Sequence, residues 1–394
     1  MSATDTQIEQ RIRHVENGLF EVEPTCMAIL QAGRAWPQKR MTLPERMAGY
    51  KVPGVSMAVI NDHSIEWAKG YGVTVAGSDT PVTTETLFEA ASTTKVLAAA
   101  IALRMVERGR LDLDEDVNAQ LKSWQIPESA FTQDQKVTLR RLLTHQSGLN
   151  RPPGGFDLEE GSTPFLVQVL KGQAPARNLA AAVEYVPGSE HQYSNFGYLV
   201  IQLLLEDLLG QPYAPIAQEI VFQPLGMRSS TLAHPLSADL QAEVALPHDD
   251  EGEPHRRAMH PTALAQGGLL TTASDLAQFT VELMLAHQGR SGRLLSPETV
   301  QRMLRPELET DPEQLLGITG QGLGFFTIAE GQNLYILHPG QNDPGANSML
   351  IASPVAGKGA VILANGFNGG RLAAEILAAV VREYNWPAVQ YAAN

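Results

Sequence analysis

The sequence has little of what disulfide-stabilised or nucleic-acid-binding proteins rely on. Its 394 residues include a single cysteine, Cys26, so no disulfide can form within the chain and no oxidising compartment is implied. Lysine and arginine number 29 against 43 acidic residues, which gives a formal net charge of −14. This balance argues against nucleic acid and against an anionic membrane surface as partners.

Long apolar runs and a secretory signal are also missing. The most apolar stretches, Leu97–Leu103 and Leu199–Leu205, are far shorter than the roughly 20 residues of a membrane-spanning helix. The first ten residues have neither a basic region nor an apolar one. Unless an export signal has been removed, we expect a cytoplasmic protein. Its 43% of hydrophobic residues suffice for a sizeable core.

Strand-like segments lie at both ends of the chain and helical ones between them. The expected strands are Gly54–Ile60, Ser64–Tyr71, Gly322–Ala329, Leu334–Leu337, Asn347–Ala352 and Ala360–Ala364. The expected helices include Thr6–Phe20, Val96–Arg108, Tyr198–Leu209, Ser274–Ala286 and Arg371–Tyr384. This order predicts an α/β (α+β) fold in which residues 1–85 and 320–394 form a sheet domain. Residues 86–319 form an inserted, mainly helical domain, and we expect a small-molecule site in the cleft between the two.

One tetrapeptide at an expected helix start has the composition of a nucleophilic site. Ser92-Thr93-Thr94-Lys95 is the only Ser-x-x-Lys in the chain. Residues three apart lie on one face of a helix, so the amine of Lys95 can approach the hydroxyl of Ser92. A desolvated lysine with a lowered pKa can take the proton of a serine. The alternative is structural, with Ser92 capping the helix and Lys95 on the surface.

Two further segments contain side chains that suit the same chemistry. Tyr193-Ser194-Asn195 is the only Tyr-x-Asn in the chain and precedes an expected helix. A phenol near a lysine can relay a proton, and an amide can bind a carbonyl or the lysine. The structural alternative is a capped helix start with Tyr193 in the core. His338-Pro339-Gly340 follows an apolar strand, where glycine lets a strand backbone approach a ligand closely.

These three marks, in this order, resemble the serine β-lactamase and penicillin-binding-protein superfamily. The resemblance is closest to its class C-like branch, which includes family VIII carboxylesterases, and it extends from about Leu43 to Trp386. It is supported by flanking segments at Val52–Ser56, Leu142–Leu149, Pro224–Met227 and Gly267–Leu276. The resemblance implies a β-lactamase/DD-peptidase-like fold, with an antiparallel sheet flanked by helices and the active site in the cleft.

The resemblance also implies roles for individual residues. Ser92 would be the acylated nucleophile and Lys95 its activating partner, while Tyr193 would share the role of base and help to activate water. Asn195 would orient the substrate or the Lys95–Tyr193 pair. The oxyanion hole would consist of the backbone N–H groups of Ser92 and Gln341, the latter directly after Gly340. Which of Lys95 and Tyr193 is the principal base stays open.

Two departures from the family pattern bear on the substrate. His338 stands where β-lactamases usually have lysine, and Pro339 stands where they often have threonine. A neutral imidazole and a proline hold an anionic substrate less firmly than a fixed cation and a hydroxyl. His338 is either a substrate contact or a hydrogen-bonding residue behind the site. We therefore expect a serine hydrolase that acts on short-chain carboxylic esters.

Other functions remain as alternatives. One is a β-lactamase, a D-amino-acid amidase or a DD-peptidase of the same fold, and another is a catalytically silent binding module, against which the three marks argue. The expected partner is a small acyl substrate, with no cofactor and no metal. His145 is interpreted as part of a structural turn, and the segment of His248, Asp249, Asp250, Glu251, His255 and His260 as a solvated loop. The oligomeric state is open.

Overall fold

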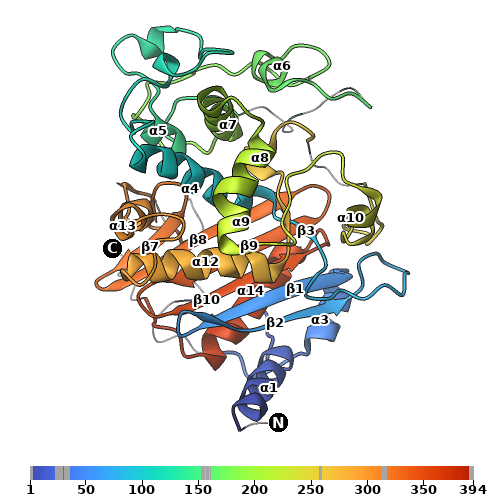
Figure 1. Ribbon diagram of the computed structural model, residues 1–394. Helices are drawn as coiled ribbons and strands as arrows, with labels where there is room; N and C mark the ends of the chain where they lie inside the picture. Colours follow the sequence, from blue (N-terminus) through green and yellow to red (C-terminus); the bar gives the residue numbers. More distant parts are fainter. Residues whose placement is uncertain are drawn as a thin grey trace.

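An antiparallel sheet forms the centre of the computed structural model (Figure 1), which describes residues 3–22, 30, 36–151, 156, 159, 161–256, 260–311 and 317–389. Within these residues the sheet has eight strands in the order β2-β1-β10-β9-β8-β7-β6-β5. They are β1 (Gly54–Asn61), β2 (Ser64–Gly72), β5 (Leu308–Glu309), β6 (Gly320–Gln321), β7 (Phe326–Glu330), β8 (Asn333–Asn342), β9 (Ala346–Ser353) and β10 (Lys358–Ala364). Because β1 pairs with β10, the two ends of the chain meet in one sheet.

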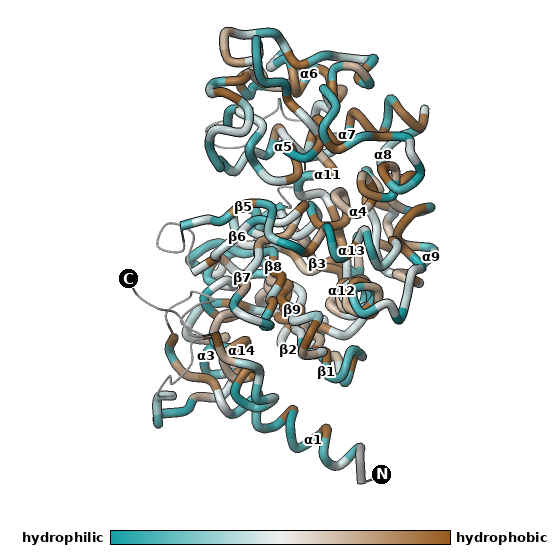
Figure 2. The backbone as a smooth tube through the Cα atoms, turned by 90° about the vertical axis from the view of Figure 1, so that its left-hand side faces the viewer, coloured by the Kyte–Doolittle hydropathy of each residue, from teal (hydrophilic) through white to brown (hydrophobic). Residues whose placement is uncertain are grey.

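Alternation along the strands gives the sheet two buried faces. In β10, Val361 and Leu363 belong to one hydrophobic core, and Ile362 and Ala364 belong to the other. Successive side chains of a strand point to opposite faces, so the unbroken apolar run from Ala360 to Ala364 serves both cores. Figure 2 shows hydrophobic residues in the central strands and also in helices away from the sheet, among them α7 and α8.

Helices cover both faces of the sheet. On one face α14 (Gly369–Glu383) packs against β9 and β10, together with α1 (Ala3–Glu16) and α3 (Leu43–Tyr50). On the other face lies α12 (Ala273–His287), and α4 (Thr94–Glu107) and α7 (Asn195–Leu209) extend that core away from the sheet (Figure 1). Every residue of α4 from Thr94 to Leu103 is buried. Within the described residues, no helix combines the length and apolarity needed to cross a membrane.

The remaining elements are short and lie mainly around the helical part. A two-stranded sheet pairs β3 (Phe88–Glu89) with β4 (Leu270–Thr271). The other helical segments are η1 (Ala91–Thr93), η2 (Val117–Ala119), η3 (Ala130–Thr132), α5 (Leu139–Leu143), α6 (Leu166–Lys171), α8 (Tyr213–Ala217), η4 (Gln218–Phe222), α9 (Gln223–Leu225), α10 (Ala238–Ala242), α11 (Leu264–Gly267) and α13 (Pro297–Leu304).

The expected fold class is confirmed, with corrections to several element bounds. The N-terminal helix ends at Glu16 and not at Phe20. The expected strand Gly322–Ala329 begins only at Phe326, because residues 322–325 form the turn between β6 and β7. β8 continues to Asn342, five residues beyond the expected end. α12 lies within the expected helical insert but packs on the sheet. The division into two domains stays a prediction, and Cys26 lies outside the described residues.

A buried ion pair attaches α3 to α14. Arg46 Nε donates to Glu375 Oε2 at 2.6 Å, and Tyr50 Oη donates to Glu375 Oε1 at 2.7 Å. The side chain of Glu375 is 1% exposed, and that of Arg46 is 13% exposed. Since removal of one partner leaves the other charge uncompensated, Glu375→Ala is expected to lower the free energy of unfolding by about 3 kcal/mol.

Chemical denaturation followed by circular dichroism measures this change. Glu383→Ala on the same helix is the matched control, because Glu383 pairs with His14, whose side chain is half exposed. Such a pair contributes less than about 1 kcal/mol. An equal loss of unfolding free energy in the two variants would contradict a larger contribution from the buried pair.

Candidate active site

Ser92 lies in a short turn that hydrogen bonds of the neighbouring residues hold against the sheet. Ala91 has a φ of +45°, and the 3₁₀ turn η1 leads directly into α4. Thr93 Oγ1 donates to the carbonyl of His338 at 3.0 Å, and Thr94 Oγ1 donates back to the carbonyl of Ala91 at 2.7 Å. Ser92 does not cap α4, whose N-cap is Thr93. The two threonine hydroxyls hold the turn, and the Ser92 side chain stays partly exposed.

The amine of Lys95 lies directly behind this hydroxyl. Lys95 Nζ is 3.0 Å from Ser92 Oγ and donates to the carbonyl of Gln266 at 2.6 Å. The Lys95 residue is 0% exposed, so the interpretation of Lys95 as a surface residue is wrong. Burial lowers the pKa of the Lys95 amine well below its ordinary value, and the positive charge of Arg151 adds to this effect. A neutral amine in hydrogen-bond contact with a serine hydroxyl can accept its proton.

The phenol of Tyr193 completes the contact. Its ring centroid is 5.0 Å from Lys95 Nζ. Burial raises the pKa of the Tyr193 phenol, and a hydrogen bond with the side chain of Ser92 works in the opposite direction. The structure thus brings hydroxyl, amine and phenol together from η1, from α4 and from the segment before α7. The catalytic roles of these three residues stay predictions.

Strand β8 brings the third sequence mark against the same turn. A Cβ on Gly340 would lie 2.5 Å from the carbonyl oxygen of Ala90 and 2.9 Å from the backbone nitrogen of Ser92. No side chain fits there, so glycine is required for this close approach. Gln341 is next on the strand, opposite Asn347 of β9. Its proposed N–H contribution to an oxyanion hole stays a prediction.

His338 is buried behind the site. Its side chain is packed with the rings of Phe326 and Tyr193, at centroid distances of 5.2 and 6.4 Å, and its Nδ1 donates to the carbonyl of Pro339 at 2.7 Å. Burial lowers the pKa of His338 to about 3. The imidazole is therefore neutral at pH 7. This position favours the second of the two roles considered above, behind the site.

Asn195 begins α7 two residues after Tyr193, so this helix starts three residues earlier than expected. The residue does not cap the helix, whose N-cap is Ser194. In the described part of the chain, the amide oxygen of Asn195 is buried and has no hydrogen-bond partner. An acceptor left in this state suits a donor brought by a substrate or by Lys95, and its role stays a prediction.

Two groups at the site could not be predicted from the sequence. The carbonyl of Gln266, which accepts from Lys95, belongs to the backbone, and a backbone group leaves no trace in residue identity. Arg151 is exposed, and its charge acts on both Lys95 and Tyr193. His145, interpreted as part of a turn, lies with its ring centroid 4.2 Å from that of Tyr193.

The histidine-rich loop has a structural role where the structure describes it. His248 Nε2 accepts from the backbone of Ala76, and its Nδ1 contacts the carbonyl of Asn365, both at 2.9 Å. His255 pairs with Asp249 at 2.6 Å. Residues 257–259 are outside the described part, and within that part no three metal-capable side chains form a cluster.

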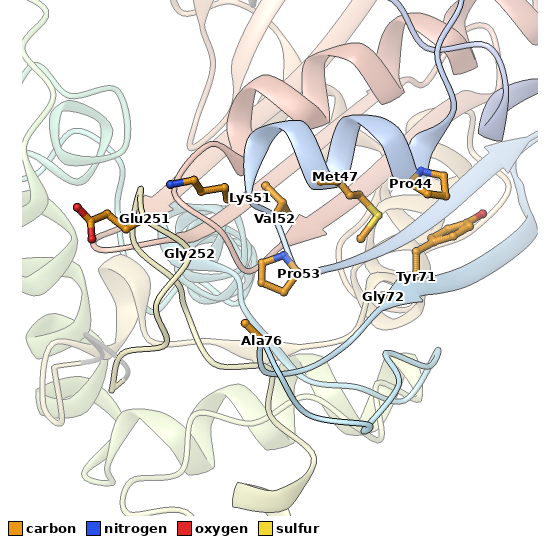
Figure 3. Close-up of a pocket in the computed structure, with 11 residues that line it drawn as sticks. Pro44, Met47, Lys51, Val52, Pro53, Tyr71, Gly72, Ala76, Glu251 and Gly252 are labelled. Atoms are coloured by element: carbon orange, nitrogen blue, oxygen red, sulfur yellow. The ribbon is translucent and has the colours of Figure 1, made fainter.

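An apolar cavity of about 540 Å³ lies apart from these residues (Figure 3). It is lined by α3, by the segment that joins α3 to β1, by the end of β2 and by the loop at Gly252, and Lys51 and Glu251 stand at its edge. None of the predicted site residues lines it. The chemistry proposed for Ser92 therefore does not take place in this cavity.

Comparison with known proteins gives a consistent family and fold. A Beta-lactamase family model matches residues 40–383. Esterase EstB of Burkholderia gladioli is 32% identical over 213 residues, which cover 51% of this chain and 52% of EstB. The chain spans about half the length of the curated relatives it matches.

Two solved structures share the fold over nearly their whole length. EstCE1, a hydrolase with promiscuous acyltransferase activity, has a TM-score of 0.74 at 22% identity, covering 96% of this chain and 100% of EstCE1. The D-amino acid amidase from Ochrobactrum anthropi SV3 has a TM-score of 0.69 at 20% identity, covering 95% and 99%.

The lowered pKa of Lys95 predicts how the reactivity of Ser92 depends on pH. Neutral amine is present above the pKa, so the rate of labelling by a fluorophosphonate should rise with pH and level off well below 10.5, the ordinary value for lysine. Intact-mass measurement of the labelled protein gives the rate, and Ser92→Ala should not be labelled. Lys95→Met should remove the pH dependence and most of the rate. A wild-type rate that still rises near pH 10 would contradict a depressed pKa.

Gly340→Ala tests the close approach of β8 to the turn. The added methyl group must displace either the strand or the backbone at Ala90 and Ser92. A shift of about 1 Å can slow a reaction 10²-fold, so labelling of Ser92 should slow by about that factor. Gly49→Ala is the control, because a Cβ at Gly49 has nothing within 4 Å. Unchanged labelling in a folded Gly340 variant would show that the strand does not set the geometry.

Proposed function

Because the chain belongs to the Beta-lactamase family, we propose that this serine hydrolase is a carboxylesterase that cleaves short-chain esters through an acyl-enzyme on Ser92. The observation that carries the proposal is the 3.0 Å contact between Ser92 Oγ and the fully buried amine of Lys95. A serine hydroxyl is a weak nucleophile until a base takes its proton, and a desolvated amine is such a base.

In the acylation step, Lys95 Nζ accepts the proton of Ser92 as Oγ bonds to the ester carbonyl carbon. The tetrahedral intermediate then collapses, the bond to the leaving alkoxide breaks, and the alkoxide takes a proton from the Tyr193 phenol. The proton held by Lys95 restores the phenol. The raised pKa of Tyr193 supports this order, because the phenol is then the proton donor and Lys95 is the principal base.

The carbonyl oxygen becomes negatively charged during this step. In the proposed geometry it accepts from the backbone N–H groups of Ser92 and Gln341, and each such donor is worth about 3–4 kcal/mol in other hydrolases. Water then attacks the acyl-enzyme and transfers a proton to the Lys95–Tyr193 pair. The pair returns a proton to Ser92 Oγ as the acid leaves. Asn195 would hold the acyl side of the substrate through its amide.

The preference for neutral esters rests on the third mark. His338 is buried with a pKa near 3, so it supplies no cation at neutral pH, and Pro339 has no N–H to donate. A substrate carboxylate therefore meets neither a lysine nor a hydroxyl at these two positions. The expected substrate is a small uncharged ester. No nucleic acid, membrane, metal or cofactor enters the proposal.

Arg151 favours a second candidate function, an amide hydrolase that acts on β-lactams or D-amino acid amides. Its exposed guanidinium acts electrostatically on both Lys95 and Tyr193 and could hold a substrate carboxylate in place of the missing lysine. The shared fold with a D-amino acid amidase is compatible with this candidate. The choice between ester and amide is a matter of relative rates on one nucleophile.

A substrate panel on the wild type and on Ser92→Ala tests both candidates. We expect hydrolysis of p-nitrophenyl acetate to exceed that of nitrocefin and of a D-Ala-D-Ala peptide, and the Ser92 variant to fold but show no turnover. Wild-type turnover by Ser92→Ala would refute the acyl-enzyme. Equal specific activity on nitrocefin would overturn the ester preference and favour the candidate that depends on Arg151.

A further inference from the structure

His145 holds the chain on both sides of Tyr193. Its backbone carbonyl accepts from the N–H of Gln192 at 2.8 Å, and its ring Nδ1 accepts from the N–H of Ser194 at 3.2 Å. The segment that carries Tyr193 belongs to no helix or strand. These two bonds therefore supply the restraint that regular secondary structure would otherwise give.

The imidazole ring of His145 also contacts the phenol directly. The centroids of the two rings are 4.2 Å apart, and the ring of Phe326 lies on Tyr193 at 6.3 Å in a stacked arrangement. A second contact at 5.5 Å joins His145 to Tyr198, one turn into α7. The phenol is held by rings from separate parts of the chain, with His145 as the nearer one.

The backbone and the tautomer of His145 suit this arrangement. The residue is 2% exposed and has a φ of +56°, a conformation that asparagine and glycine also tolerate. Because Nδ1 accepts a hydrogen bond, the proton of the neutral ring is on Nε2. Burial lowers the pKa of His145 well below its ordinary value, so the acceptor persists at neutral pH.

We propose that His145 is a positioning residue, which fixes the phenol of Tyr193 against the hydroxyl of Ser92 through Nδ1 and the ring face. This inference rests on the proposed function, since it assigns His145 a role in the same reaction. His145 itself exchanges no proton with the substrate. Its loss should leave substrate binding in place and slow the chemical steps, because a phenol displaced by about 1 Å costs as much as 10²-fold in rate.

The experiment compares two substitutions that both tolerate the backbone conformation. His145→Gly removes the ring and the acceptor, and His145→Asn keeps a side-chain acceptor within reach of the Ser194 N–H. With p-nitrophenyl acetate, the glycine variant should lose about 10²-fold in kcat with little change in KM. The asparagine variant should recover most of kcat. His287→Gly, at the last residue of α12, is the matched control and should keep the wild-type kcat.

Thermal unfolding establishes that each variant is folded. If the glycine variant is not folded, His145→Ala replaces it, because alanine also lacks the acceptor and has the smallest side chain. An unchanged kcat in the folded variant that lacks the acceptor overturns the proposal. An asparagine variant that is as slow as the variant without an acceptor also overturns the proposal, because the hydrogen bond to Ser194 then does not hold the phenol. Ser92→Ala is assayed alongside the His145 variants. Turnover by Ser92→Ala would mean that the proposed function fails, whereas the results above concern only the role of His145.

Discussion

The structure depends on keeping one amine out of water. Lys95 is fully buried under the hydroxyl of Ser92, and its two hydrogen-bond partners, the hydroxyl and the carbonyl of Gln266, are both uncharged. Burial without an opposing carboxylate disfavours the ammonium form, so the amine becomes a base at a pH where an exposed lysine is charged. A carboxylate placed beside it would restore the charge and remove this property.

The surrounding fold supplies this environment through contacts between distant segments. η1 contacts strands β8 and β9, and α4, which follows η1, packs against α7 and α11. The buried hydroxyls of Thr93, Thr94 and Ser348 donate to or accept from groups of the turn and the neighbouring strands, so burial leaves few polar groups unpaired. The missing side chain at Gly340 allows the strand to reach the backbone of Ser92.

The charged and neutral side chains around the site affect both the proposed base and the choice of substrate. His338 and His145 are buried and neutral, so they pack beside Tyr193 without adding charge near the amine of Lys95. The exposed Arg151 is a cation at the surface of the site, and it depresses the pKa of Lys95 further. A single side chain could thus attract an anionic substrate and keep the base deprotonated. In the proposed function, His338 and Pro339 disfavour a substrate carboxylate, and Arg151 is the side chain that would oppose this preference.

Local patterns in the sequence determined the strands at both ends of the chain, the apolar helices and the three marks, because periodicity and residue type are local properties. The sequence alone also indicated that Lys95 follows Ser92 at helical spacing. The tertiary structure decided which atoms surround that pair. The carbonyl of Gln266 and the ring of His145 come from segments far along the chain, and whether a histidine or an arginine faces a site depends on long-range packing. The early start of α7 at Asn195 and the extension of β8 to Asn342 were likewise set by contacts across the molecule, which outweigh local propensity at the ends of elements.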